Sequence, residues 1–184
     1  EYFDFTTETS RLSFNAKNGG TTGYIEIDFL GDNANERVFN SHRPRIRRAF
    51  IKTGNVLMGQ EWTTFQNLSA IPESASFLTA SEGQIFVRQH MVRWTNGPLQ
   101  IALKNPGESG IGGTTAANTF DNAERPDIVV RNNHKADFGN ISASLLSRQI
   151  SNGMDGDAGF DEDGISFNIA GRVKAGPGDV RFTY

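Results

Sequence analysis

Apolar and polar residues alternate along several segments of the chain, which is the pattern of a β-strand with one apolar and one polar face. In segment 11–17 the apolar side is Leu12, Phe14 and Ala16, with polar residues between them. The same period of two recurs in 23–30, 99–104 and 164–173. A helical period of 3.6 is absent over any helical length, and the best helix candidate is a turn or two in 72–78. We therefore predict about ten strands, at 11–17, 23–30, 43–53, 56–66, 85–95, 99–104, 127–132, 141–150, 164–173 and 179–184.

The connections between these segments are short and long in turn. Short joints fall at residues 18–20, 54–55, 96–97, 132–136 and 176–178. Long polar stretches fall between them, at 31–42, 67–83, 106–126 and 151–163. Tight turns at one end of the strands and long loops at the other are typical of an antiparallel, up-and-down transmembrane β-barrel.

Composition is compatible with such a barrel. The chain has 184 residues, 36% of them hydrophobic, and a mean hydropathy of -0.45. No run approaches the ~20 apolar residues of a spanning helix, and a barrel strand needs only alternate apolar residues. With no cysteine, thiolate metal sites, a cysteine nucleophile and disulfides are excluded. A net charge of -3 indicates no nucleic-acid partner.

In a barrel, the polar face of each strand would line water. That face carries the cations Arg11, Lys17, Arg131, Arg148 and Arg172, with Glu26 and Asp28 as an acidic minority. Two strands are irregular. Arg45 and Arg47 fall on the opposite face from Arg48, so either some lie near a rim or a bulge resets the phase; we expect the rim for Arg45. Arg93 falls on the other face of its predicted strand from Arg88, and the sequence leaves open which of these two faces lines water.

Several blocks occur in an order that resembles one family. The more specific are Gly59-Gln60-x-Trp62-x-Thr64-Phe65 and Pro126-Asp127-Ile128-Val129-x-Arg131. Around them stand Ser10-Arg11-Leu12, Glu26-x-Asp28-Phe29, Arg48-Ala49-Phe50, Leu68-Ser69-Ala70-Ile71-Pro72-Glu73, Arg88-Gln89 with Arg93, Asn105-Pro106 and Ser147-Arg148-Gln149. From Ser10 to about Lys174, the chain is similar to DcaP-like outer-membrane porins.

The resemblance implies a homotrimeric channel in the lipid of the Gram-negative outer membrane, passing small anionic solutes such as dicarboxylates. It places Arg48 and Arg88 in the lumen, and we include Arg93 with them. One departure is Lys104, which stands where the family tends to carry an acid before Asn-Pro. A porin barrel of about 16 strands needs roughly twice this length. Residues 1–184 are therefore expected to be a single porin-like domain, the N-terminal half of a longer barrel.

Two long loops allow alternative interpretations. Residues 67–83, with Pro72 and Glu73, are expected either to narrow the lumen as a constriction or to form a plain surface loop. The acidic stretch 151–163 suits a solvated loop better than a calcium site, because its spacing does not fit an EF-hand. The three histidines are scattered. We predict no catalytic residue, no cofactor and no metal site.

Two other classes remain open at this stage. One is a soluble, secreted β-sandwich that binds carbohydrate through exposed aromatics such as Trp62, Phe86 and Trp94. The other is a self-contained barrel of eight to ten strands, filled by its own side chains, with a structural or adhesive role. Alternation alone does not separate them, because the apolar face meets a core in one case and lipid in the other.

Overall fold

The computed structural model describes residues 7–31, 42–72, 87–106, 124–151 and 161–184. Glu73 and most of the acidic stretch 151–163 lie outside these ranges. The described residues form ten strands and one short 3-10 helix: β1 (Leu12–Asn18), β2 (Thr21–Gly31), β3 (Arg43–Thr53), β4 (Val56–Trp62), η1 (Leu68–Ala70), β5 (Arg88–Asn96), β6 (Leu99–Lys104), β7 (Asp127–Ala136), β8 (Gly139–Ser151), β9 (Asp161–Ala175) and β10 (Gly178–Thr183).

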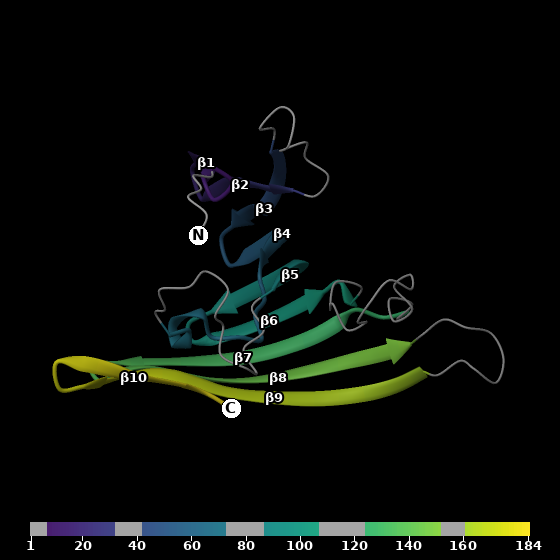
Figure 1. The fold of residues 1–184 in the computed structure, drawn as a ribbon. Coiled ribbons are helices and arrows are strands. Elements are labelled where there is room, and N and C mark those ends of the chain that lie inside the picture. The colour runs from purple at the N-terminus through teal and green to yellow at the C-terminus, as the bar shows by residue number, and fades with distance from the viewer. Residues whose placement is uncertain (1–6, 32–41, 73–86, 107–123, 152–160) are drawn as a thin grey trace, which may run out of the picture.

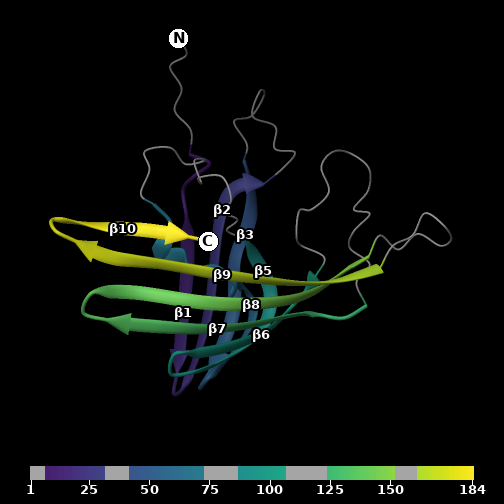
Figure 2. The ribbon, with the colours of Figure 1, turned by 90° about the horizontal axis from the view of Figure 1, so that it is seen from below.

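All ten strands belong to one sheet, in which each strand pairs only with its neighbours in the sequence, from β1 to β10. The nine pairings are antiparallel. The sheet is strongly twisted, so that β7 to β10 run across the direction of β1 to β3 (Figures 1 and 2). In the described part of the chain β1 and β10 are not paired with each other, and the sheet is not closed. The expected all-β, up-and-down fold is confirmed.

The five short turns lie at one end of the sheet, and the strand ends that are joined by longer stretches of sequence lie at the other (Figure 1). The tight turns after β1, β3, β5 and β9 each contain a glycine with a φ of 54–57°, a conformation that costs other residues free energy. The turn expected at 132–136 lies instead at Asp137–Phe138. Residues from Asn132 to Lys135 pair one by one with β8, so the ladder satisfies their backbone groups in spite of their polar side chains.

The two faces of the sheet have the polarity of a membrane barrel. The outer face carries exposed apolar side chains such as Phe14, Phe167 and Ile165, which is 82% exposed. Within the described residues, buried side chains are more often polar than apolar, and they include Asp28 and Asp127. The described strands all belong to this one sheet, and none of them forms a second layer against its apolar face. The β-sandwich alternative is therefore wrong, since it requires two packed sheets.

A β-bulge in β3 determines which face of the sheet its arginines occupy. Glu26 of β2 pairs with Arg48, while the next residue, Ile27, pairs with Ile46, so that Arg47 is the extra residue. The bulge turns Arg45, Arg47 and Arg48 to the inner face, where all three meet carboxylates. Thus the bulge accounts for the face that Arg45 occupies, and a position near the rim stays a prediction. The Gln60 side-chain amide donates to the carbonyl oxygens of Ile46 (3.2 Å) and Arg47 (3.0 Å) at this bulge.

Strand β4 ends at Trp62, four residues before the predicted end at Gln66. From Thr63 the chain leaves the sheet and folds over its inner face. The backbone N–H of Thr63 still donates to the Val87 carbonyl (2.9 Å), but the following residues bond to side chains of distant strands. The short helix η1 follows at Leu68–Ala70, and the helical turn expected in 72–78 lies, apart from Pro72, outside the described residues. Among the described residues, no helix is long and apolar enough to cross a membrane.

Candidate functional site

A segment folded inside the sheet, Thr63–Ile71, shapes the candidate site. We call it the inward segment. It extends from the end of β4 to β9 and β10, which η1 contacts. Thr64, Asn67 and Ala70 are almost fully buried in it. Asn67 caps η1, because its side-chain oxygen accepts a hydrogen bond from the Ser69 N–H (3.0 Å).

Side chains of four strands fasten this segment to the inner face. Ser144 of β8 donates to the Phe65 carbonyl (2.7 Å), and Arg131 of β7 donates to the Gln66 carbonyl (2.6 Å). The Asn67 amide donates to Asn140 of β8 (2.7 Å). Arg181 of β10 donates to the Ile71 carbonyl (2.6 Å), and Lys104 of β6 approaches the Thr63 hydroxyl at 3.5 Å. The inward segment is thus tied to a width of five strands.

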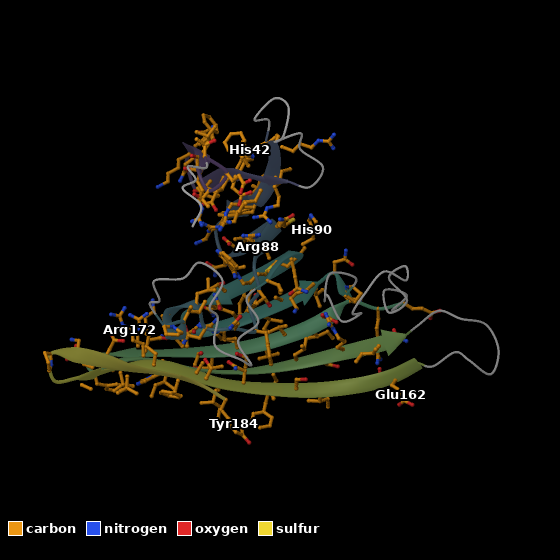
Figure 3. All side chains as sticks on the ribbon, in the orientation of Figure 1. His42, Arg88, His90, Glu162, Arg172 and Tyr184 are labelled. Carbon is orange, nitrogen blue, oxygen red and sulfur yellow. The ribbon has the colours of Figure 1, made fainter. Side chains whose placement is uncertain are left out.

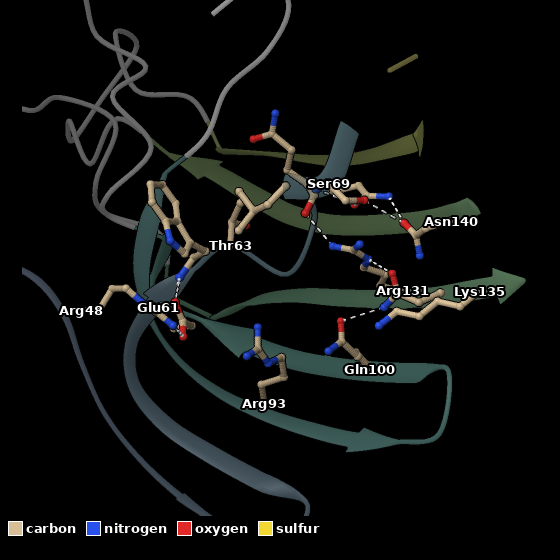
Figure 4. A pocket seen from close by; sticks show the side chains of 14 residues that line it. Arg48, Glu61, Thr63, Ser69, Arg93, Gln100, Arg131, Lys135 and Asn140 are labelled. Carbon is tan, nitrogen blue, oxygen red and sulfur yellow. Dashed lines mark hydrogen bonds and ion pairs between the residues drawn. The ribbon is translucent and has the colours of Figure 1, made fainter. Parts of the chain in front are cut away.

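A cavity of about 390 Å³ lies between the inward segment and the wall (Figure 4). Its lining is strongly cationic. The charged and amide side chains that line it from the strands are Arg48, Glu61, Arg93, Gln100, Arg131, Asn133, Lys135 and Asn140. The inward segment adds Thr63, Gln66, Asn67, Leu68 and Ser69. Such an arrangement of guanidinium, ammonium and amide donors suits an anion with several oxygen acceptors.

Beside the cavity, Arg48 faces Glu61. Its Nε and Nη2 donate to the two carboxylate oxygens at 2.7 Å and 2.6 Å. The guanidinium carbon also lies 4.7 Å from the centroid of the Tyr24 ring. This two-pronged pair, with a cation–π contact on the other side, fixes the orientation of Arg48.

Further ion pairs lie along the inner face. Asp28 accepts from Arg45 (2.7 Å) and Arg47 (2.9 Å), and Arg47 also donates to Glu26 (2.8 Å). A second cluster joins β5 to β8. In it, Arg148 pairs with buried Asp127 (2.5 Å), and Lys104 donates to Gln89 (2.8 Å) and lies 3.7 Å from Asp127. Lys104 therefore neutralises an acid in the wall, and does not extend into open solvent.

The structure assembles only some of the predicted lumen residues around the cavity. Arg48, Arg93 and Arg131 line it. Glu26, Asp28 and Arg148 lie on the inner face, engaged in the ion pairs above. Their roles toward a solute stay predictions.

Other predicted site residues lie elsewhere. Arg11 is exposed and precedes β1. The Arg88 guanidinium carbon lies 4.9 Å from the centroid of the Trp62 ring, at the beginning of β5. Pro72 is exposed at the end of the inward segment, and Glu73 lies outside the described residues. In the described ranges, no group of three or more His, Cys, Asp or Glu residues is placed to hold a metal ion.

Sequence reasoning missed Glu61, Lys135 and Asn140 as members of the site. Lys135 and Asn140 oppose each other in the β7–β8 ladder, but Lys135 was assigned to a turn and Asn140 fell just before the strand predicted at 141–150. Glu61 occupies the variable place inside the Gly59-Gln60-x-Trp62 block. Counting alternate residues from Arg131 would have placed Lys135 on the inner face, whereas Glu61 shares its face with apolar Leu57 and the same count would not have found it.

A single antiparallel sheet with an apolar outside, a charged inside and an inward-folded loop defines the wall of a porin-like β-barrel. The chain is similar in fold to the outer membrane channel DcaP of Acinetobacter baumannii, known from a crystal structure. The TM-score is 0.74 and the sequence identity is 24% over 94% of this chain. The resemblance read from the sequence is thereby confirmed at the level of the fold. This chain spans 49% of the length of that channel. No protein-family model matches the sequence, and no curated protein matches it.

Proposed function

We propose that this chain forms part of the wall of a passive diffusion channel for small anions, including dicarboxylates, in the Gram-negative outer membrane. The observation that carries the proposal is the inverted polarity of the sheet. Apolar side chains such as Ile51 and Ile165 are exposed on the outside, while charged groups such as Asp127 and Arg47 are buried inside. This suits a sheet with hydrocarbon outside and water inside. The fold similarity to a channel supports a role in transport without catalysis.

Anion preference is supported by the charge of the cavity. The lining carries four cations, Arg48, Arg93, Arg131 and Lys135, against the single carboxylate of Glu61. One contact between unit charges is worth about 1 kcal/mol at the dielectric constant of water and about 4 kcal/mol at an effective value near 20. Several such contacts favour anions, and each is weak enough to release the ion, as conduction requires.

The homotrimer belongs to the proposal on the strength of the sequence resemblance. In such an assembly, part of the exposed apolar outer face would contact a second copy and the rest would contact lipid. Because the chain corresponds to about half of the similar channel, conduction is proposed for the complete barrel that contains it.

The test is electrical recording of the intact gene product in planar lipid bilayers. In a potassium chloride gradient, we expect a reversal potential on the anion-selective side. Neutralising Arg48, Arg93, Arg131 and Lys135 together should move it toward zero. A reversal potential that the four substitutions leave unchanged would contradict the proposed anion preference, and a gene product that is monodisperse without detergent would contradict the membrane location.

A further inference from the structure

The arginines on the inner face differ in whether a carboxylate balances their charge. Most of them do have such a partner: Arg45, Arg47, Arg48, Arg148, Arg172 and Arg181. Arg93 is different. Within the described ranges it forms no ion pair, and its Nε atom is buried without a hydrogen-bond partner.

The surroundings of Arg93 leave room for a bound group. In the strand register, Arg93 opposes Ala102, and Ala102 opposes Val129. Ala102 is fully buried and ends in a methyl group, so the β6 residue opposite Arg93 offers its guanidinium no polar partner. Gln66, which lines the same cavity, also has a side-chain oxygen without a partner; this acceptor suits a water molecule, whereas the Arg93 donor suits an anion. Buried polar atoms without partners are uncommon, and they mark places where water or a ligand binds.

Arg131 of β7 lies close to Arg93 in the strand register. Unlike Arg93, it forms several hydrogen bonds within the protein. Its Nη1 donates to the carbonyls of Gln66 (2.6 Å) and Thr64 (3.4 Å), and its Nε donates to Asn133 (2.7 Å). These bonds hold the guanidinium against the inward segment (Figure 4). No carboxylate among them cancels the charge, so Arg131 acts as a fixed positive charge beside Arg93.

We propose that Arg93 is the residue that binds a carboxylate of the permeating anion. Arg131 adds a fixed charge, whereas Arg48 and Arg148, being ion-paired, hold the wall together. A planar guanidinium matches a carboxylate through two parallel hydrogen bonds. This inference rests on the proposed function, because it assigns the solute contact within the same cavity.

The experiment measures how malonate, a short dicarboxylate, blocks chloride current through the intact gene product in lipid bilayers. Replacing Arg93 by glutamine should raise the malonate concentration for half-block by about tenfold, the usual worth of a charge-assisted hydrogen bond. Arg93→Lys keeps the positive charge but cannot form two parallel hydrogen bonds to one carboxylate. The variant should therefore keep the wild-type reversal potential and be blocked less strongly by malonate. Single-channel conductance confirms that each variant has folded and inserted.

Two controls separate a specific contact from a general loss of charge. Lys135→Gln removes one positive charge from the same cavity and should change the block by less than about threefold. The double variant Arg48→Gln with Glu61→Gln removes an ion pair of the same cavity at constant net charge and should change the block by less than Arg93→Gln does. If Arg93→Gln changes the block no more than Lys135→Gln does, the assignment of Arg93 is overturned while the channel function stands. If the wild-type protein shows neither anion selectivity nor malonate block, both proposals are overturned.

Discussion

Arg48 and Glu61 form a two-pronged ion pair across β3 and β4, with donor–acceptor distances of 2.7 Å and 2.6 Å. Both residues line the cavity. The pair therefore hides one of the cavity's positive charges from a passing ion, and Glu61 determines how cationic the cavity is.

Replacing Glu61 by glutamine should make the channel more selective for anions. The substitution keeps the shape of the side chain and leaves Arg48 without its counter-charge. Because one charge at about 4 Å is worth about 1 kcal/mol in water, we expect the chloride-to-potassium permeability ratio to rise about two- to fivefold. Reversal potentials in a salt gradient measure this ratio. Glu162→Gln, at the far end of β9 from Arg172 (Figure 3), is the control and should change the ratio little. A ratio that falls in Glu61→Gln would contradict this role.

Asn67 should control how firmly the inward segment is held. Its side chain caps η1, donates to Asn140 (2.7 Å) and is almost fully buried. In Asn67→Ala, the loss of a cap and a buried hydrogen bond should lower the free energy of unfolding by about 1–2 kcal/mol. We also expect larger and noisier single-channel currents, since the segment then samples positions away from the wall. Leu68→Ala is the neighbouring control for the free energy of unfolding, because Leu68 is exposed. Currents of wild-type size and steadiness in Asn67→Ala would show that other contacts suffice.

The strands were predictable because they express a local rule. Around Ile101 and Phe167, apolar residues recur with period two, and the turn glycines Gly54 and Gly97 mark where the chain reverses. These signals need no knowledge of distant residues. For the same reason, the fold class, the strand order and the sorting of short and long connections could be read from the sequence.

The site was less predictable because it depends on register and on distant contacts. A single extra residue, Arg47, reverses the phase of β3; the local pattern showed the irregularity but did not distinguish a bulge from a position near the rim. Thr63–Gln66 contains residues that favour strands, such as Thr64 and Phe65. That segment turns inward because Ser144 and Arg131, far along the chain, bind its carbonyl groups. Arg93 likewise could be assigned to a face only once β5 was paired with β6.

Asp127 should be essential for stability as the shared acid of buried Lys104 and partly buried Arg148. It is fully buried, bonds to Arg148 and lies 3.7 Å from Lys104, which is 4% exposed. Asp127→Asn leaves these cations without a carboxylate, and breaking a buried ion pair in this way costs about 3–5 kcal/mol. Guanidinium unfolding in detergent micelles, followed by tryptophan fluorescence, measures the change. The double variant Asp127→Asn with Lys104→Met removes one charge of each sign and should recover part of the loss. Equal free energies of unfolding for the single and double variants would contradict the prediction that Lys104 needs Asp127 as its counter-charge.

The orientation of the sheet is tested most directly on β9, where adjacent residues face opposite sides. Phe167 is exposed on the outer face, and its neighbour Ser166 is exposed on the inner face. On the surface of a water-soluble protein, arginine would be tolerated at either position. If the outer face contacts lipid, Phe167→Arg should lower the free energy of unfolding by about 2–4 kcal/mol near the middle of the bilayer, while Ser166→Arg should change it little. Folding into lipid vesicles at increasing urea concentration measures both variants under one condition. Equal stability of the two variants would contradict a lipid-facing outer surface, and with it the assignment of the inner face to a water-filled channel.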